Sequence, residues 1–190
     1  MQAIIRNITL VLLISLTLIV KGQKFEGGLY FGLTTSQING DNLSGYHKIG
    51  LNLGFQTALP VGENAKFQFE LAFIQKGAKE VPNDTTNASN FYKATLNYIE
   101  IPIIFQYRWK YLSFDIGPAL DILVSSKEEW DGFEGSSDPP FSGVNLVAIV
   151  GVNWHFSEKW YLSLRTNNSL SIIREGNAYS GDNPSIINFG

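Results

Sequence analysis

Residues 96–107, LNYIEIPIIFQY, alternate between two kinds of side chain along most of their length. One face carries Ile99, Ile101, Ile103, Phe105 and Tyr107, and the other carries Tyr98, Glu100, Pro102, Ile104 and Gln106. A period of two residues is typical of a β-strand with one apolar face and one largely polar face. This stretch therefore predicts a strand that separates two different environments.

The same alternation recurs through most of the chain after residue 22. It predicts strands over residues 25–36, 47–59, 66–76, 96–107, 111–124, 143–156 and 160–172, and a short last strand that begins near residue 185. No stretch after residue 22 has the 3.6-residue period of a helix. The chain is therefore predicted to be all-β and antiparallel, with about eight strands.

Short and long connections alternate between the predicted strands. Those at 60–65, 109–110 and 157–159 are short, and those through 39–45, 77–91, 125–142 and 174–184 are longer. Outer-membrane β-barrels have short periplasmic turns, longer extracellular loops and aromatic residues at both membrane interfaces. The pattern predicts an up-and-down transmembrane barrel in the outer membrane, with its N-terminus in the periplasm. Periodicity alone also fits a secreted soluble barrel that binds an apolar ligand inside.

Composition narrows the classes of function. The chain has 190 residues, 16% of them charged, a formal net charge of −3 and no Cys. The charged fraction is below the roughly 25% of soluble domains. The absence of Cys excludes disulfides, a thiolate nucleophile and a Cys-ligated metal site within this sequence. An acidic chain without a basic run is a poor nucleic-acid binder, so no nucleic-acid partner is expected.

Residues 1–22 are predicted to be a signal peptide. Arg6 supplies a positive charge, and residues 10–20 form an apolar run of the expected length. The alternative, a membrane anchor helix, needs roughly 20 apolar residues, which this run does not reach. We expect residues 23–190 to form a single outer-membrane β-barrel domain.

Three motifs resemble the PorT-like family of small outer-membrane β-barrel proteins from Gram-negative bacteria. They are QKG at residues 75–77, LNYIEIPI at 96–103 and DIGP at 115–118, and the opening GGLYFGL at 27–33 also fits. The resemblance implies an eight-stranded membrane barrel and a link to a secretion or envelope system. It also implies that the barrel-assembly machinery inserts the chain. One departure is the short last strand, ending at Gly190, which leaves open a truncated sequence or an unusual closure.

If the apolar faces meet lipid, the polar faces fill the lumen. The predicted lumen charge network comprises Glu70, Lys76, Glu100, Arg108, Asp115, Asp121 and Arg165. Antiparallel pairing predicts that Lys76 lies near Glu100 and that Glu70 lies near Arg108. Because the interior of an eight-stranded barrel is about wide enough for side chains alone, we expect a plug of paired charges. A polar path or binding pocket is the alternative. Pro102 and Pro118 are predicted to produce local bulges, because each removes a ladder donor.

No catalytic residue, cofactor or metal site is predicted. Only His47 and His155 offer an imidazole, and the acidic residues of the 125–142 loop match no calcium-binding spacing. The alternative is an outer-membrane hydrolase that uses His155, with Asn153 and Ser163 as its expected neighbours.

The long loops are the better candidates for binding. Trp130, Phe133 and Phe141 are predicted to be exposed on the longest loop. Exposed aromatic side chains often mark contact surfaces. We expect these residues either to contact an envelope or secretion protein, or to anchor the loop among the lipids of the outer membrane.

Overall fold

Nine antiparallel strands make up the part of the fold that the structure describes. A computed structural model describes residues 25–39, 46–79, 92–135, 139–175 and 186–189, so the predicted signal peptide lies outside the described residues. The strands are β1 (Glu26–Asn39), β2 (Lys48–Pro60), β3 (Ala65–Lys79), β4 (Tyr92–Trp109), β5 (Leu112–Trp130), β6 (Phe133–Gly135), β7 (Val144–His155), β8 (Tyr161–Ser169) and β9 (Ile186–Phe189). In the part of the chain that is described, no helix is long and apolar enough to cross a membrane.

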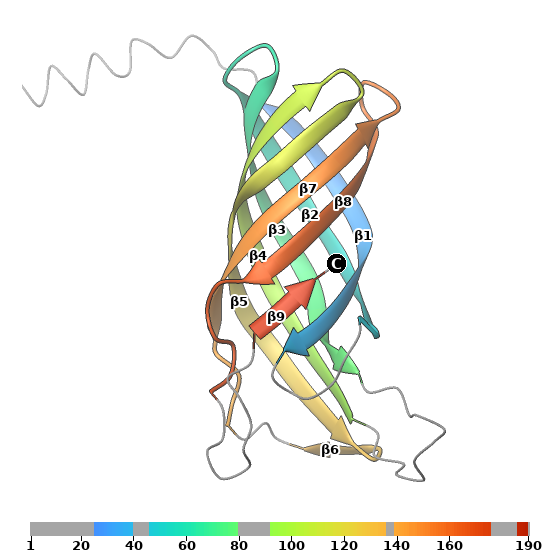
Figure 1. Cartoon of the computed structure of the whole chain (residues 1–190), viewed down its shortest axis with the longest axis vertical. Coiled ribbons are helices and arrows are strands. Elements are labelled where there is room, and N and C mark those ends of the chain that lie inside the picture. Colours follow the sequence, from blue (N-terminus) through green and yellow to red (C-terminus); the bar gives the residue numbers. More distant parts are fainter. Residues whose placement is uncertain (1–24, 40–45, 80–91, 136–138, 176–185, 190) are drawn as a thin grey trace, which may run out of the picture.

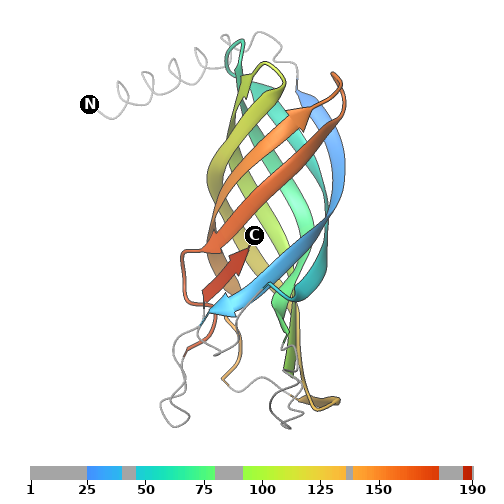
Figure 2. The same cartoon turned by 45° about the vertical axis from the view of Figure 1, so that its right-hand side comes forward.

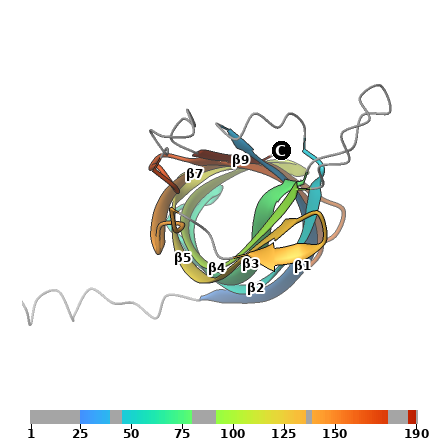
Figure 3. The ribbon, with the colours of Figure 1, turned by 90° about the horizontal axis from the view of Figure 1, so that it is seen from below.

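Eight of the strands close into one barrel (Figures 1, 2 and 3). Their order is β4-β3-β2-β1-β9-β8-β7-β5, and β4 also pairs with β5, which completes the ring. The remaining strand, β6, pairs only with the end of β5. The predicted all-β, antiparallel, up-and-down barrel is therefore confirmed, including its short last strand.

The two ends of the barrel differ. The tight connections β2–β3, β4–β5 and β7–β8 lie together at the top of Figure 1, which we call the turn end. The opposite end, where β1, β3, β5 and β8 finish, is called the loop end. The alternation of short and long connections predicted from the sequence is thus present.

Alternation along the strands places apolar side chains on the outside. In β4, the side chains of Tyr98, Glu100, Ile104 and Gln106 point inward and are buried, whereas Ile101, Ile103, Phe105 and Tyr107 are exposed. Leu29, Phe31, Leu33, Ile116, Val150, Leu162 and Leu164 extend this exposed apolar surface around the barrel. At the turn end it is bordered by Trp109, Tyr111, Trp154, Phe156 and Trp160. The alternative of a soluble barrel with its apolar faces inward is therefore wrong.

Several strands extend past their predicted bounds, and β4 and β5 do so most. β4 begins at Tyr92, four residues before its predicted start, and β5 continues to Trp130, although residues 125–130 were expected to be loop. Beyond Trp130 the chain reverses at Asp131 and Gly132, whose φ angles are 50° and 85°. Trp130 then pairs with Phe133 of β6. The first half of the predicted 125–142 loop is therefore a β5–β6 hairpin.

Closure of the ring is uneven. β9 pairs with β1 at four positions, Ser36–Asn39, and with β8 at Asn168 alone. Among the described residues, no strand lies between residues 26–35 of β1 and residues 161–167 of β8. Side chains must therefore hold these two strands in the turn half of the barrel.

The predicted bulges at the two prolines are wrong. The strand ladder is interrupted beside Pro102 between β3 and β4, and beside Pro118 between β4 and β5, yet the register is the same on both sides of each gap. The register shift between β4 and β5 lies instead at Asn97 and Tyr98. A missing donor removes a hydrogen bond without adding a residue, so the strands stay aligned.

Candidate functional site

The candidate site is the interior of the barrel, where inward side chains form successive layers. A polar layer lies at the turn end, two charged clusters lie in the middle, and an apolar layer lies towards the loop end. We describe the charged clusters first, because they contain most of the residues predicted from the sequence.

Lys76 of β3 is the centre of the first charged cluster. Its Nζ lies 2.8 Å from Oε2 of Glu100 and 2.6 Å from Oδ2 of Asp121, and its side chain is 0% exposed. Glu100 and Asp121 are opposite each other in the β4–β5 register. Asn167 donates to Glu100 at 3.2 Å, and Asn145 lies 3.5 Å from Asp121. One lysine therefore pairs with two carboxylates, all three buried inside the barrel.

Arg165 of β8 is the centre of the second charged cluster. Its guanidinium lies 2.8 Å from Glu70 of β3 and 3.0 Å from Asp115 of β5. The hydroxyl of Tyr30, on β1, donates to Glu70 at 2.8 Å. Tyr161 of β8 donates to Gln56 of β2 at 2.8 Å. These contacts connect β8 with β1, β2, β3 and β5 where no strand lies between β1 and β8.

A polar layer occupies the turn end. Ser113 Oγ lies 2.8 Å from Nε2 of His155, and Asn153 donates to Ser113 at 3.0 Å and to Asp115 at 2.8 Å. Gln106 also donates to Asp115, at 2.7 Å. Ser113 is 0% exposed. The serine is therefore next to an imidazole but is closed off from solvent.

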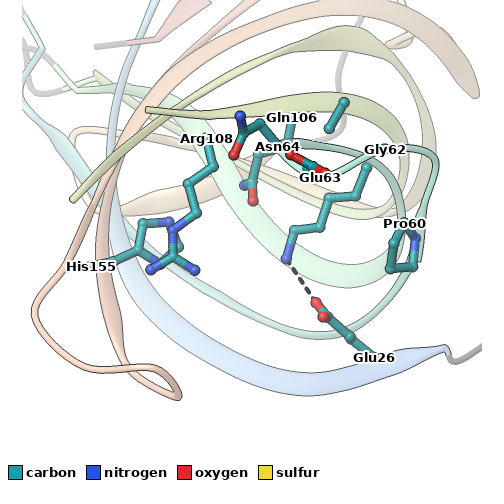
Figure 4. A pocket seen from close by; sticks show the side chains of 10 residues that line it. Glu26, Pro60, Gly62, Glu63, Asn64, Gln106, Arg108 and His155 are labelled. Atoms are coloured by element: carbon teal, nitrogen blue, oxygen red, sulfur yellow. Dashed lines mark hydrogen bonds and ion pairs between the residues drawn. The ribbon is translucent and has the colours of Figure 1, made fainter. Parts of the chain in front are cut away.

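A small pocket opens beside this layer at the turn end (Figure 4). Its volume is about 120 Å³, and residues from β1, the β2–β3 turn, β3, β4 and β7 line it. Charged and polar lining residues include Glu26, Glu63, Asn64, Lys66, Arg108 and His155.

The loop half of the interior is apolar, which the sequence did not lead us to expect. Ile38, Ile74, Leu96, Tyr98, Phe141 and Ile173 belong to one buried cluster. Beside this cluster, Arg174 lies 2.8 Å from Glu128, which also accepts a hydrogen bond from Tyr92. The guanidinium of Arg174 lies 5.0 Å from the centre of the Phe141 ring. The expected polar lumen is thus interrupted in its loop half by an apolar layer, beside which Arg174 and Glu128 form a further ion pair.

Of the seven predicted lumen charges, six lie inside in two clusters. Lys76 is brought together with Glu100 and Asp121, and Arg165 with Glu70 and Asp115. The predicted approach of Glu70 to Arg108 is wrong. β3 begins at Ala65, opposite Tyr107, so Arg108 lies past its end and is exposed at the barrel mouth, whereas Glu70 lies deeper inside.

The three predicted loop contact residues do not share one environment. Phe133 is 79% exposed at the β5–β6 hairpin, and Trp130 is exposed while its ring packs 4.3 Å from that of Tyr92. Phe141 is only 8% exposed, because it packs inside the apolar layer. The prediction that Phe141 is an exposed contact residue is therefore wrong.

Several interior residues were missed or misplaced. His155 was expected beside Asn153 and Ser163, but Ser113 is its hydrogen-bond partner. Tyr30, Gln68, Asn145 and Asn167 also bind the buried carboxylates, and their inward positions in alternating strands were the available signal. The Asp131–Gly132 pair was a signal for the hairpin, because Asp-Gly favours tight turns with positive φ.

The described residues contain no group of three or more His, Asp or Glu side chains that is arranged to hold a metal ion. Two acidic residues of the predicted 125–142 loop instead form ion pairs with lysine side chains. Glu129 lies 3.1 Å from Lys93, and Glu134 lies 3.3 Å from Lys127.

Comparison with known proteins identifies the family. The model of the family described as "Outer membrane protein beta-barrel domain" matches residues 21–174. No curated protein and no solved structure matches the chain. The match covers seven of the eight ring strands, from β1 to β8, and it agrees with the exposed apolar exterior and the polar interior. The chain belongs to the outer-membrane β-barrel domain family and is an integral protein of the outer membrane.

Proposed function

We propose that the protein is a non-enzymatic barrel that acts as a structural and interaction protein through its loop end, with an interior that conducts nothing. The observation that carries this proposal is the filled lumen. Two clusters of paired charges and an apolar layer lie in series between the turn end and the loop end. An eight-stranded barrel filled in this way offers no continuous water path.

The proposed orientation has the turn end in the periplasm and the loop end outside the cell. Its support is the general arrangement of such barrels, which have short periplasmic turns and longer extracellular loops. Cysteine labelling tests it, because the chain has no Cys of its own. Phe133→Cys at the loop end should react with a membrane-impermeant maleimide on intact cells. Glu63→Cys at the turn end should react only after lysis, and the reverse result would overturn the orientation.

The β5–β6 hairpin is the proposed contact surface. It presents Trp130 and Phe133 at the loop end. We propose that the exposed apolar surface of the barrel contacts the lipids of the outer membrane and that the hairpin lies beyond it. We propose an envelope or secretion protein as its partner, in line with the PorT-like resemblance. We also propose that the barrel-assembly machinery inserts the chain.

Photo-crosslinking in living cells tests the contact surface. A benzoylphenylalanine at residue 133 should give an adduct with a specific protein. The same group at residue 116, which lies on the exposed apolar surface of the barrel, serves as the control. Adducts with lipid alone at both positions would show that the hairpin is a membrane anchor and would overturn the proposed contact.

A hydrolase is the second candidate, and one observation favours it. Ser113 Oγ lies 2.8 Å from Nε2 of His155, which is the pairing of a nucleophile with its base. Against it, Ser113 is fully buried and a substrate has no access to Oγ. A fluorophosphonate probe should therefore leave the folded protein unlabelled. Labelling that disappears in Ser113→Ala would favour the hydrolase and contradict a non-enzymatic role.

A further inference from the structure

The pocket at the turn end brings together hydrogen-bond donors that have no partner. Arg108 uses Nε to bind the backbone oxygen of Lys110 at 3.3 Å, and its terminal nitrogens contact no carboxylate among the described residues. Its backbone N–H binds the carbonyl oxygen of Asn64 at 2.7 Å, which fixes the β2–β3 turn against the end of β4. The side-chain amide of Asn64 has no partner among the described residues. Figure 4 shows Arg108 and His155 on the same side of this pocket.

The hydrogen bonds of Ser113 determine what His155 offers to the pocket. Asn153 Nδ2 donates to Ser113 Oγ, so the one hydroxyl proton of Ser113 is available for Nε2 of His155. A neutral imidazole that accepts at Nε2 carries its proton on Nδ1. No partner of Nδ1 is present in the described part of the chain. In the tautomer in which Ser113 donates to Nε2, His155 therefore lines the pocket with a free N–H donor at Nδ1.

The charges around the pocket are mixed, and their pairing decides its character. Glu26 lies 3.1 Å from Lys66, so these two groups neutralise each other. The carboxylate of Glu63 is exposed on the β2–β3 turn and binds no described group. Arg108 is left as a cation with free donors, beside the free donors of Asn64 and His155.

From this arrangement we propose that the pocket binds a compact oxyanion, a carboxylate or phosphate group, through Arg108, His155 and Asn64. Planar guanidinium groups bind such anions through two parallel hydrogen bonds. The volume of about 120 Å³ is sufficient, because a single water needs only about 10–15 Å³ by the same kind of measure. The anion is either free or carried by a lipid headgroup. The inference is independent of the proposed loop-end contacts and of the orientation of the barrel.

The two histidines of the chain provide a direct readout. The full-length folded protein, in an uncharged detergent, is titrated with inorganic phosphate while the imidazole NMR signals are recorded. The signals of His155 should shift and saturate, whereas those of His47, at the other end of the barrel, should not move. Unchanged His155 signals at 50 mM phosphate would overturn the proposal.

Three variants separate a specific site from general attraction. Arg108→Gln should weaken phosphate binding by about tenfold or more, because it removes a charged donor. Glu63→Gln should strengthen binding, because it removes the unpaired carboxylate. Lys110→Gln removes the same charge as Arg108→Gln at the same end but outside the pocket lining, and should leave binding within about twofold. Equal weakening by Arg108→Gln and Lys110→Gln would overturn the site.

Nanodiscs then identify the source of the anion. In nanodiscs of phosphatidylcholine alone, free phosphate should shift His155 as it does in detergent. If added phosphatidylglycerol produces the same shift and Arg108→Gln abolishes it, the site binds a lipid headgroup. If phosphatidylglycerol has no effect while phosphate still binds, the site takes a free oxyanion.

Discussion

Lys76 carries the positive charge that faces both Glu100 and Asp121 in the interior. Removal of one partner from a buried ion pair is strongly destabilising, because the remaining charge has no compensation. We expect Lys76→Met to lower the free energy of unfolding by about 3–5 kcal/mol, measured by urea titration in detergent micelles. Lys76→Met combined with Glu100→Gln and Asp121→Asn should recover most of that loss. A loss in the triple variant as large as in the single one would show that lysine packing, not charge, is what matters.

Phe141 tests the apolar layer in the loop half of the interior. Phe141→Ala should lower the free energy of unfolding by about 3–5 kcal/mol, as for other buried aromatic residues. Phe133→Ala, at an exposed position of the hairpin, should change it by less than about 0.5 kcal/mol. Heat-dependent migration on gels gives the comparison for both variants. Similar midpoints would contradict the placement of Phe141 inside the barrel.

At the scale of single residues, the sequence predicted which side chains face inward better than it predicted their partners. Alternation correctly placed Lys76, Glu100 and Asp121 in the lumen. It placed Arg108 beside Glu70, because the starting residue of β3 sets the register and alternation does not contain that information. Phe141 lies outside any strand, so no period could indicate that it folds inward.

Among the strands, β8 relies on Arg165 on its β1-facing side, because β9 pairs with it there at Asn168 alone. Arg165→Lys keeps the charge but loses the planar fork that reaches both Glu70 and Asp115. It should lower the free energy of unfolding by about 1–3 kcal/mol and speed hydrogen exchange in β8 more than in β3. Arg108→Lys, at an exposed position without an ion pair, is the matched control and should change stability by less than about 0.5 kcal/mol. Equal effects of the two variants would contradict the role of Arg165.

The β5–β6 hairpin depends on the conformation of its turn. Gly132 has a φ of 85°, which residues with a Cβ adopt at a cost of about 1 kcal/mol. Gly132→Ala should therefore speed hydrogen exchange of the paired amides in residues 128–135 by about fivefold. Gly135→Ala is the control, because an added Cβ there meets only Trp130, at 3.9 Å. Equal exchange in the two variants would contradict the observed turn.

Strand positions in the middle of the barrel were predictable because the two faces of each strand meet different surroundings. The extension of β5 was not predictable, because Lys127, Glu128 and Glu129 interrupt the alternation of apolar and polar residues there. There, cross-strand ion pairs such as Lys93 with Glu129 stabilise the ladder in place of apolar contacts.

For the whole molecule, the sequence predicted the class of fold and the direction of its faces. It did not predict the order of the interior layers, which depends on how eight strands stagger around the ring. The filled interior is the central claim, and ion conductance tests it most directly. Protein refolded into lipid vesicles, with its folding verified by faster migration of the unboiled sample, is fused with a planar bilayer. We predict no stable current steps above the lipid background. Reproducible steps of constant conductance would contradict a barrel filled from one end to the other.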